Sequence, residues 1–298
     1  MKKLAVFLLV LLLIPCMAGS ETVVTSFYPV WLMTLNLTRG LEDHVAVRNL
    51  AAPSVGCLHD YQLQTADMKA LSDADVFLVN GAGMESFLPE IVHALPGLPV
   101  VEASEGIQLL EKGNTLEILS SDVPEEYNSH LWLDPLRAIR MAENLAAGLI
   151  RLLPGDEAAI TANLEDYRSR LLMLDEQLRE NLQRLSRRDI VTFHEAFPYF
   201  AAAYDLQVAA VVNKEPGEVL TPAQMGELVR EIIRLGNPPL FVEPQYTDLS
   251  AQTLSRETGS SVYTLDPMVT GPETDVPLNY YETVMLHNSE TLMEALSD

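Results

Sequence analysis

Four residues spaced widely along the chain have side chains that bind transition metals: His59, His130, His194 and Asp266. Each stands just past an apolar, strand-like run, and in open α/β sheets the ligand-binding groups occupy the loops beyond the strands' carboxyl ends. Three imidazoles and one carboxylate form a plausible tetrahedral set for a divalent transition ion. Any one of these histidines taken alone is more simply interpreted as an ordinary polar residue, so the prediction of one metal site between two lobes depends on context.

Catalytic motifs are incomplete in this sequence. His194 and Glu195 begin an H-E-x-x-H pattern, but Pro198 stands where the second His is required and would disturb the helix. A site with four protein ligands also lacks the open position that catalytic zinc keeps for water. We therefore expect no enzyme, and a metal-dependent hydrolase is the weakest alternative.

The elements that would position these side chains fall into two groups of four strands. Most of the runs are short, apolar and without polar alternation, as in a parallel sheet covered on both faces. Helix-like stretches lie between them, so the alternation predicts two α/β lobes. The strands are expected at residues 22–27, 44–50, 75–80, 99–102, 189–193, 206–212, 239–242 and 261–265, and examples of the helices at 65–72, 135–153, 222–235 and 249–258.

The strongest helix signal lies between the two groups of strands. Residues 156–188 contain no Gly or Pro, and large apolar residues recur there at spacings of three or four. At about 1.5 Å per residue, this helix would be about 50 Å long, enough to run along both lobes. We predict lobes at residues 21–155 and 189–298, joined by this helix. A coiled coil is the alternative for so regular a stripe.

The first 20 residues indicate export. Lys2 and Lys3 precede an unbroken apolar run, which small or uncharged residues follow, as in a secretory signal peptide. The apolar run is about half of the roughly 20 residues that a membrane-spanning helix needs. We expect a periplasmic or extracytoplasmic protein cleaved near residue 18 or 20, with lipid attachment at Cys16 as the alternative. Once Cys16 is removed, Cys57 is the one remaining thiol, which excludes an internal disulfide.

The charge balance excludes some partners. The formal charge is −23, and removing Lys2 and Lys3 lowers it to −25. Nucleic acids and anionic membrane surfaces repel such a protein. An acidic surface also raises the local concentration of cations, which is compatible with a metal site.

Several segments together resemble the zinc/manganese-type solute-binding proteins of bacterial ABC importers. The resemblance covers nearly the whole chain after the signal peptide, and the pattern His-x-Trp-Leu-Asp-Pro before a helix is its most specific part. The segments are Leu58-His59-Asp60-Tyr61, Ala74 to Gly81 with Glu85, His130-Leu131-Trp132-Leu133-Asp134-Pro135, Phe193-His194-Glu195-Ala196-Phe197 and Leu265-Asp266-Pro267.

This resemblance implies a fold, a ligand set and partners. The fold would be two parallel-sheet lobes joined by one long rigid helix, with the metal site in the cleft between them. His59, His130, His194 and Asp266 match the ligand positions, zinc is the expected ion and manganese the alternative. The partners would be a membrane permease and its ATPase, and we expect a monomer. A binding protein for a siderophore, haem or cobalamin shares the lobes and is the alternative function.

Two departures from the family pattern concern the metal site. Leu58 stands where family members commonly have Pro, and residues 102–128 contain acids but no His, so a His-rich metal-collecting loop is missing. Cys57 is a possible soft ligand, although a small buried thiol is its simpler interpretation. Three carboxylates, Asp60, Glu195 and Glu243, are candidates for orienting a ligand imidazole. Trp132 is expected to pack beneath the His130 loop without touching the ion.

Overall fold

A computed structural model describes most of the chain. The described residues are 20–54, 58, 61–111, 127–212, 221–245 and 249–297. The predictions made for residues 1–19 (Cys16 included), Cys57, His59 and Asp60 lie outside them. Within the described ranges, no helix has the length and apolar character needed to cross a membrane.

Two four-stranded sheets form the centres of two lobes, and every strand pairing in them is parallel. The strand orders, β2-β1-β3-β4 and β6-β5-β7-β8, are the same in both sheets. All eight predicted strands are present, with ends within two residues of the prediction. They are β1 (Glu21–Thr25), β2 (Val45–Asn49), β3 (Val76–Val79), β4 (Val100–Glu102), β5 (Asp189–Thr192), β6 (Gln207–Val211), β7 (Leu240–Val242) and β8 (Val262–Thr264).

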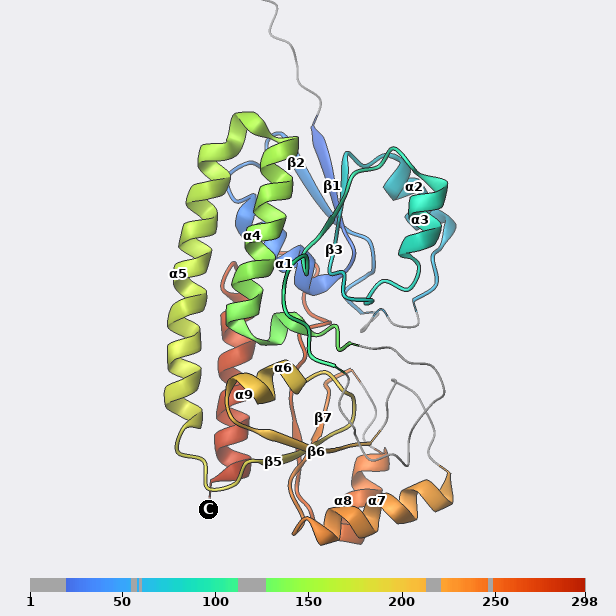
Figure 1. The fold of residues 1–298 in the computed structure, drawn as a ribbon, viewed down its shortest axis with the longest axis vertical. Helices are drawn as coiled ribbons and strands as arrows, with labels where there is room; N and C mark the ends of the chain where they lie inside the picture. The colour runs from blue at the N-terminus through green and yellow to red at the C-terminus, as the bar shows by residue number, and fades with distance from the viewer. Residues whose placement is uncertain are drawn as a thin grey trace, which may run out of the picture.

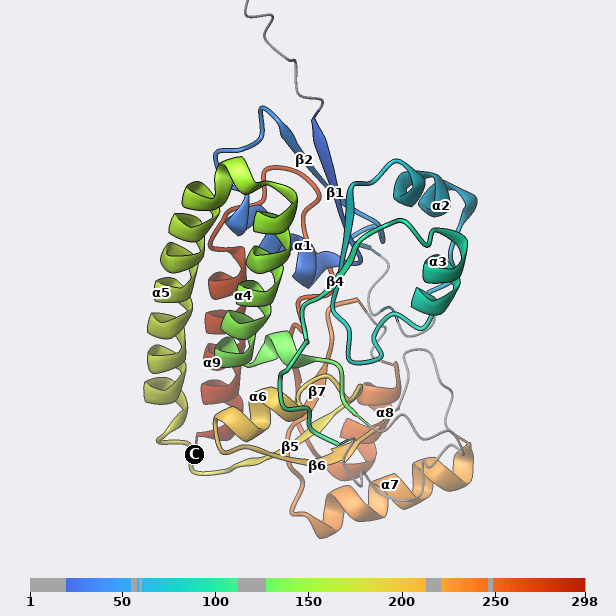
Figure 2. The ribbon, with the colours of Figure 1, turned by 45° about the horizontal axis from the view of Figure 1, so that its top comes forward.

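The inner strands are apolar because helices cover both of their faces. Every residue of β3 and β7 is buried. In the first lobe, α2 and α3 lie beside the sheet, and in the second, α7 and α8 pack on it through a separate buried cluster (Figures 1 and 2). The predicted two-lobed α/β fold is therefore confirmed. The shorter helices are α1 (Tyr28–Leu37), α2 (Thr65–Ser72), α3 (Leu88–Ala94), α4 (Pro135–Leu152), α6 (Pro198–Ala203), α7 (Pro222–Arg234), α8 (Leu249–Thr258) and α9 (Tyr280–Leu296).

Local signals explain where two of the predicted helices begin. Asp134 caps α4 by accepting a hydrogen bond from the Leu136 amide at 2.9 Å, and Pro135 follows it in the first turn. Thr221 begins α7 with a capping box completed by Gln224. The cap at Asp134 makes α4 begin shortly after the segment that carries His130.

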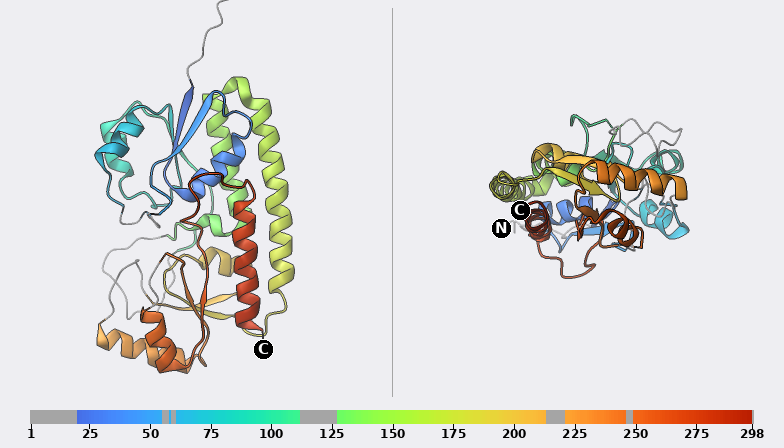
Figure 3. Two further views of the ribbon diagram at one scale, coloured as in Figure 1. Left: turned by 180° about the vertical axis from the view of Figure 1, so that it is seen from behind. Right: turned by 90° about the horizontal axis from the view of Figure 1, so that it is seen from below.

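The long helix α5 (Glu157–Leu182) extends along both lobes. It packs against α4 beside the first lobe and against α9 beside the second (Figure 1, and from behind in Figure 3). Its inner face contributes Tyr167, Leu171 and Leu178 to one buried cluster that includes side chains of both lobes. The lobes therefore share a hydrophobic core along this helix.

The helix ends six residues before the predicted limit of 188. The Arg187 amide and the Ser186 hydroxyl both donate to the carbonyl of Leu296, at 3.2 and 2.9 Å, at the C-terminal end of α9. Hydrogen bonds to α9 thus take the place of further hydrogen bonds within α5. The 26 residues of α5 span about 39 Å. The domain limits at residues 155/156 and 188/189 stay a prediction.

A buried carboxyl group fixes the loop after β3. The loop has positive φ angles at Gly81, Ala82 and Gly83, of 75°, 52° and 81°. Glu85 closes it by accepting hydrogen bonds from the amides of Asn80 and Gly81, at 2.8 and 3.0 Å. Burial raises the pKa of Glu85 from its ordinary value of 4.5 to about 7, although the two amides oppose this rise.

The raised pKa of Glu85 predicts a pH dependence of stability. The native state holds this proton more tightly than the unfolded chain, so its contribution to the free energy of unfolding falls as pH rises from about 4.5 to about 7. Glu85→Gln removes the titration. As the pH rises from 5 to 8, we expect the free energy of unfolding of the wild type to fall by about 2 kcal/mol relative to that of Glu85→Gln.

The measurement is urea unfolding of both proteins at the two pH values. The control is Glu90→Gln, which changes an exposed carboxyl group of α3 and should follow the wild type at both. Parallel curves for Glu85→Gln and the wild type would contradict the buried-carboxyl assignment.

Candidate metal centre

Two of the predicted ligands follow strands of the second sheet. His194 lies two residues past the end of β5, and Asp266 lies two residues past the end of β8. His130 does not follow a strand, contrary to the prediction. It immediately precedes a 3-10 turn, Leu131–Leu133, that leads into α4. Between β4 and His130, the described residues form one isolated antiparallel bridge, Glu111 with Tyr127, in place of a strand. His59 lies outside the described residues.

His130 is buried and its ring is oriented by an amide side chain. Asn128 Oδ1 accepts from the His130 backbone N–H at 3.0 Å and lies 3.2 Å from His130 Nδ1. Asn128 Nδ2 donates to the Glu195 carbonyl, so Oδ1 is the acceptor end of this amide. The contact therefore selects the tautomer with the proton on Nδ1 and the lone pair on Nε2. The ring centroids of Trp132 and His130 are 5.1 Å apart, so Trp132 packs beside His130.

His194 is oriented by a buried carboxyl group. Its Nδ1 lies 2.8 Å from Oε1 of Glu243, and both side chains are almost fully buried. Gln245 donates to the other oxygen of Glu243 at 2.5 Å, which fixes the carboxylate from the opposite side. Of the carboxylates considered from the sequence that the structure describes, Glu243 contacts a candidate ligand imidazole directly. The backbone carbonyl of Glu195 accepts from Asn128 Nδ2.

The two described histidines come together from the two lobes. Their ring centroids are 4.9 Å apart in an edge-to-face arrangement, although the residues are far apart in the sequence. In both, the acceptor contact at Nδ1 assigns the lone pair to Nε2, the form of histidine that binds metals.

Asp266 is held by its backbone and partly buried. Asn288, on α9, accepts from the Asp266 amide at 2.9 Å and donates to its carbonyl at 2.8 Å. The carboxylate accepts from the Met268 amide at 2.7 Å, and Met268 has a positive φ of 63°. Burial raises the pKa of Asp266; the Met268 amide lowers it, the charge of Glu243 raises it and His287 lowers it. A nearby cation would favour the ionised form of Asp266.

The described part of the chain contains no group of three His, Cys, Asp or Glu side chains placed to hold one ion. The structure brings His130 and His194 together. Asp266 follows β8, which is separated from β5, the strand before His194, by β7 alone. The set of four with His59 therefore stays a prediction.

Two amides at this centre were missed by sequence reasoning. Asn128 orients His130, and Asn288 holds the backbone of Asp266 from 22 residues away. The position of Asn128 two residues before His130 is a weak signal for such a role. Nothing in the spacing of Asn288 indicates one.

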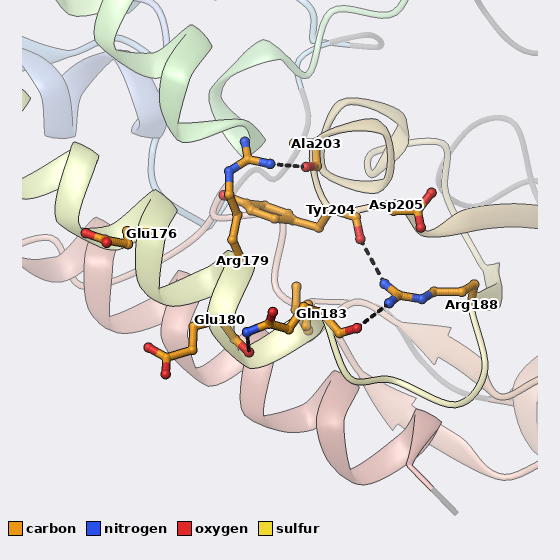
Figure 4. Close-up of a pocket in the computed structure, with 9 residues that line it drawn as sticks. Glu176, Arg179, Glu180, Gln183, Arg188, Ala203, Tyr204 and Asp205 are labelled. Atoms are coloured by element: carbon orange, nitrogen blue, oxygen red, sulfur yellow. Dashed lines mark hydrogen bonds between the residues drawn. The ribbon is translucent and has the colours of Figure 1, made fainter.

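A separate pocket lies at the C-terminal end of α5 and shares no residue with this centre. Figure 4 shows Arg179 and Arg188 lining it beside Tyr204. Arg179 donates to the Ala203 carbonyl, and Arg188 donates to the carbonyls of Tyr204 and Gln183. Because the chain's own carbonyls take up these donors, we assign no ligand to this pocket.

Comparisons with known proteins agree with this fold. The family model described as "ZnuA: Zinc-uptake complex component A periplasmic" matches residues 23–295. The zinc-binding lipoprotein AdcA of Streptococcus pneumoniae is 27% identical over 284 residues, which cover 93% of this chain and 56% of AdcA. The manganese-binding lipoprotein MntA of Halalkalibacterium halodurans is 28% identical over 245 residues, covering 80% of this chain and 77% of MntA.

A solved structure of Zn(II)-bound AdcA from Streptococcus pneumoniae superposes with a TM-score of 0.79 at 26% identity, covering 94% of this chain and 58% of that one. The chain thus spans little more than half the length of AdcA. Because the family model matches almost the whole chain, the protein belongs to the ZnuA family of metal-binding solute-binding proteins. The family description is of a periplasmic component, which agrees with the extracytoplasmic location predicted from the N-terminus.

The contact between His194 and Glu243 generates a prediction. Glu243→Gln keeps an acceptor near Nδ1 but removes the negative charge that makes the imidazole a better donor to a metal. Loss of such a partner typically weakens metal binding about 10- to 100-fold, and we expect a decrease in zinc affinity toward the lower end. Competition with a chromophoric chelator measures it.

The matched control is Glu231→Gln, which removes a partly exposed carboxylate that pairs with the exposed Arg234 on α7. It should bind zinc as the wild type does. Equal affinities for Glu243→Gln and Glu231→Gln would mean that His194 does not bind the ion.

Proposed function

We propose that this protein is an extracytoplasmic receptor that binds one divalent transition-metal ion and delivers it to an ABC import permease. The observation that carries the proposal is the pair of buried imidazoles, 4.9 Å apart, each with its Nδ1 against an acceptor. Burying two polar imidazoles costs free energy, and binding a cation through their Nε2 atoms would offset that cost.

The proposed ligands are His59, His130, His194 and Asp266. Three nitrogen donors and one oxygen suit tetrahedral zinc, whereas manganese prefers more oxygen ligands and higher coordination. Zinc is therefore the proposed cargo, and manganese is the alternative. AdcA is named for zinc and MntA for manganese, so similarity to relatives supports either ion.

The other properties follow from the same proposal. Four protein ligands leave no position for an attacking water, so we propose a receptor without catalytic activity. The partners would be the permease and its ATPase, which drives import. The acidic chain is not suited to nucleic acid, and we propose that it acts as a monomer.

The first test is calorimetric titration of the mature protein with zinc after removal of metal. We expect one ion per chain and a higher unfolding temperature, because binding to the native state adds about 4 kcal/mol at roughly 1,000 times the dissociation constant. No heat and no stabilisation with either zinc or manganese would contradict a metal receptor.

The second test addresses the choice of ion. His194→Glu replaces a nitrogen donor with a harder oxygen donor that can bind through both oxygens, which manganese favours. We expect zinc to bind more tightly than manganese in both proteins, with a smaller ratio in the variant. Titrations at one fixed pH are required, because imidazole ligands bind deprotonated. An unchanged ratio would place His194 outside the coordination shell.

A further inference from the structure

We infer that Asn128 and Trp132 are positioning residues, which bond the segment carrying His130 to the loops carrying His194 and Asp266. The inference rests on the proposed metal-receptor function. It concerns a property that the ligand set alone does not give: His130 keeps its place relative to the other two side chains whether or not an ion is bound.

The bonds lie on both sides of His130 at equal separation. Two residues before it, Asn128 Nδ2 donates to the carbonyl of Glu195 at 2.7 Å. Two residues after it, Trp132 Nε1 donates to the carbonyl of Pro267 at 2.8 Å. Glu195 directly follows His194, and Pro267 directly follows Asp266. Each bond therefore runs from a side chain near His130 to the backbone beside another proposed ligand.

The second lobe also donates back to the same segment. The hydroxyl of Tyr199 donates to the Asn128 carbonyl at 2.7 Å, and that of Tyr281 donates to the Trp132 carbonyl at 2.5 Å. Asn128, Trp132 and both tyrosines are fully or almost fully buried. Separating the segment from the second lobe would break four hydrogen bonds between buried groups, which is costly.

The segment is fixed to the first lobe as well. Asn80, after β3, donates to the Ser129 carbonyl at 3.0 Å, and Phe27 packs edge-to-face on Trp132 at 5.2 Å. Residues 128–132 therefore bridge the lobes. The segment that carries His130 is thus bonded to the second lobe's loops as well as to the first lobe.

The experiment compares three variants of the mature protein. Trp132→Phe keeps an aromatic ring at this position but removes the N–H that donates to Pro267. Tyr281→Phe removes only the hydroxyl that donates to Trp132. The matched control, Tyr204→Phe, also removes one buried tyrosine hydroxyl, which donates to Asp175 on α5 at 3.0 Å and touches no ligand loop.

Two readouts are taken for each protein: zinc affinity and the visible absorption of the Co(II)-loaded form, which reports the geometry of the donors. The unfolding temperature of the metal-free protein serves as the common measure of stability. We expect Trp132→Phe to bind zinc about tenfold or more weakly, as for other partners that orient metal ligands, and to shift the Co(II) bands. Tyr281→Phe should change both readouts in the same direction, and it carries the test if Trp132→Phe does not fold.

Tyr204→Phe should keep the wild-type affinity and Co(II) spectrum even though its unfolding temperature falls. Wild-type affinity and spectrum in Trp132→Phe and Tyr281→Phe would overturn the positioning role while leaving the receptor function standing. A wild-type protein that binds neither zinc nor Co(II) would overturn the function itself, and with it this inference.

Discussion

The relative placement of the two lobes is the constraint on which the contact between two buried imidazoles, and with it the candidate metal site, depends. Rings of His130 and His194 lie 4.9 Å apart, and each has an acceptor at Nδ1, an amide in one case and a carboxylate in the other. This arrangement holds only if both lobes keep their relative placement. The shared core along α5 and the bonds around residues 128–132 provide that placement.

The repeated sheet order is consistent with the candidate site lying between the lobes. Both sheets have the order 2-1-3-4 within their own set of strands, and the parallel strands of each lobe end at one edge. In the second lobe, this edge carries His194 and Asp266, as open α/β sheets generally place their binding groups. In the first lobe, the candidate ligand His130 precedes α4, and its neighbours Asn128 and Trp132 are bonded across to the second lobe.

Apolar runs made the sheets predictable, whereas contacts between distant residues did not follow from the sequence. All eight strands were predicted because buried parallel strands are short runs of Val, Leu, Ile and Phe. The end of α5 was wrong by six residues, since the carbonyl of Leu296 takes the Arg187 amide. The roles of Asn128 and Asn288 depend on which amide atoms face which backbone groups, and spacing along the chain carries no such information.

X-ray absorption spectroscopy of the zinc-loaded mature protein tests the central claim most directly, because it separates sulfur from nitrogen or oxygen neighbours and counts the imidazole rings bound to the ion. The account predicts one zinc with three imidazole nitrogens and one carboxylate oxygen, all at about 2.0–2.2 Å. A sulfur neighbour at about 2.3 Å would instead make Cys57 a ligand, and a shell with fewer than two imidazoles would contradict the His130–His194 site.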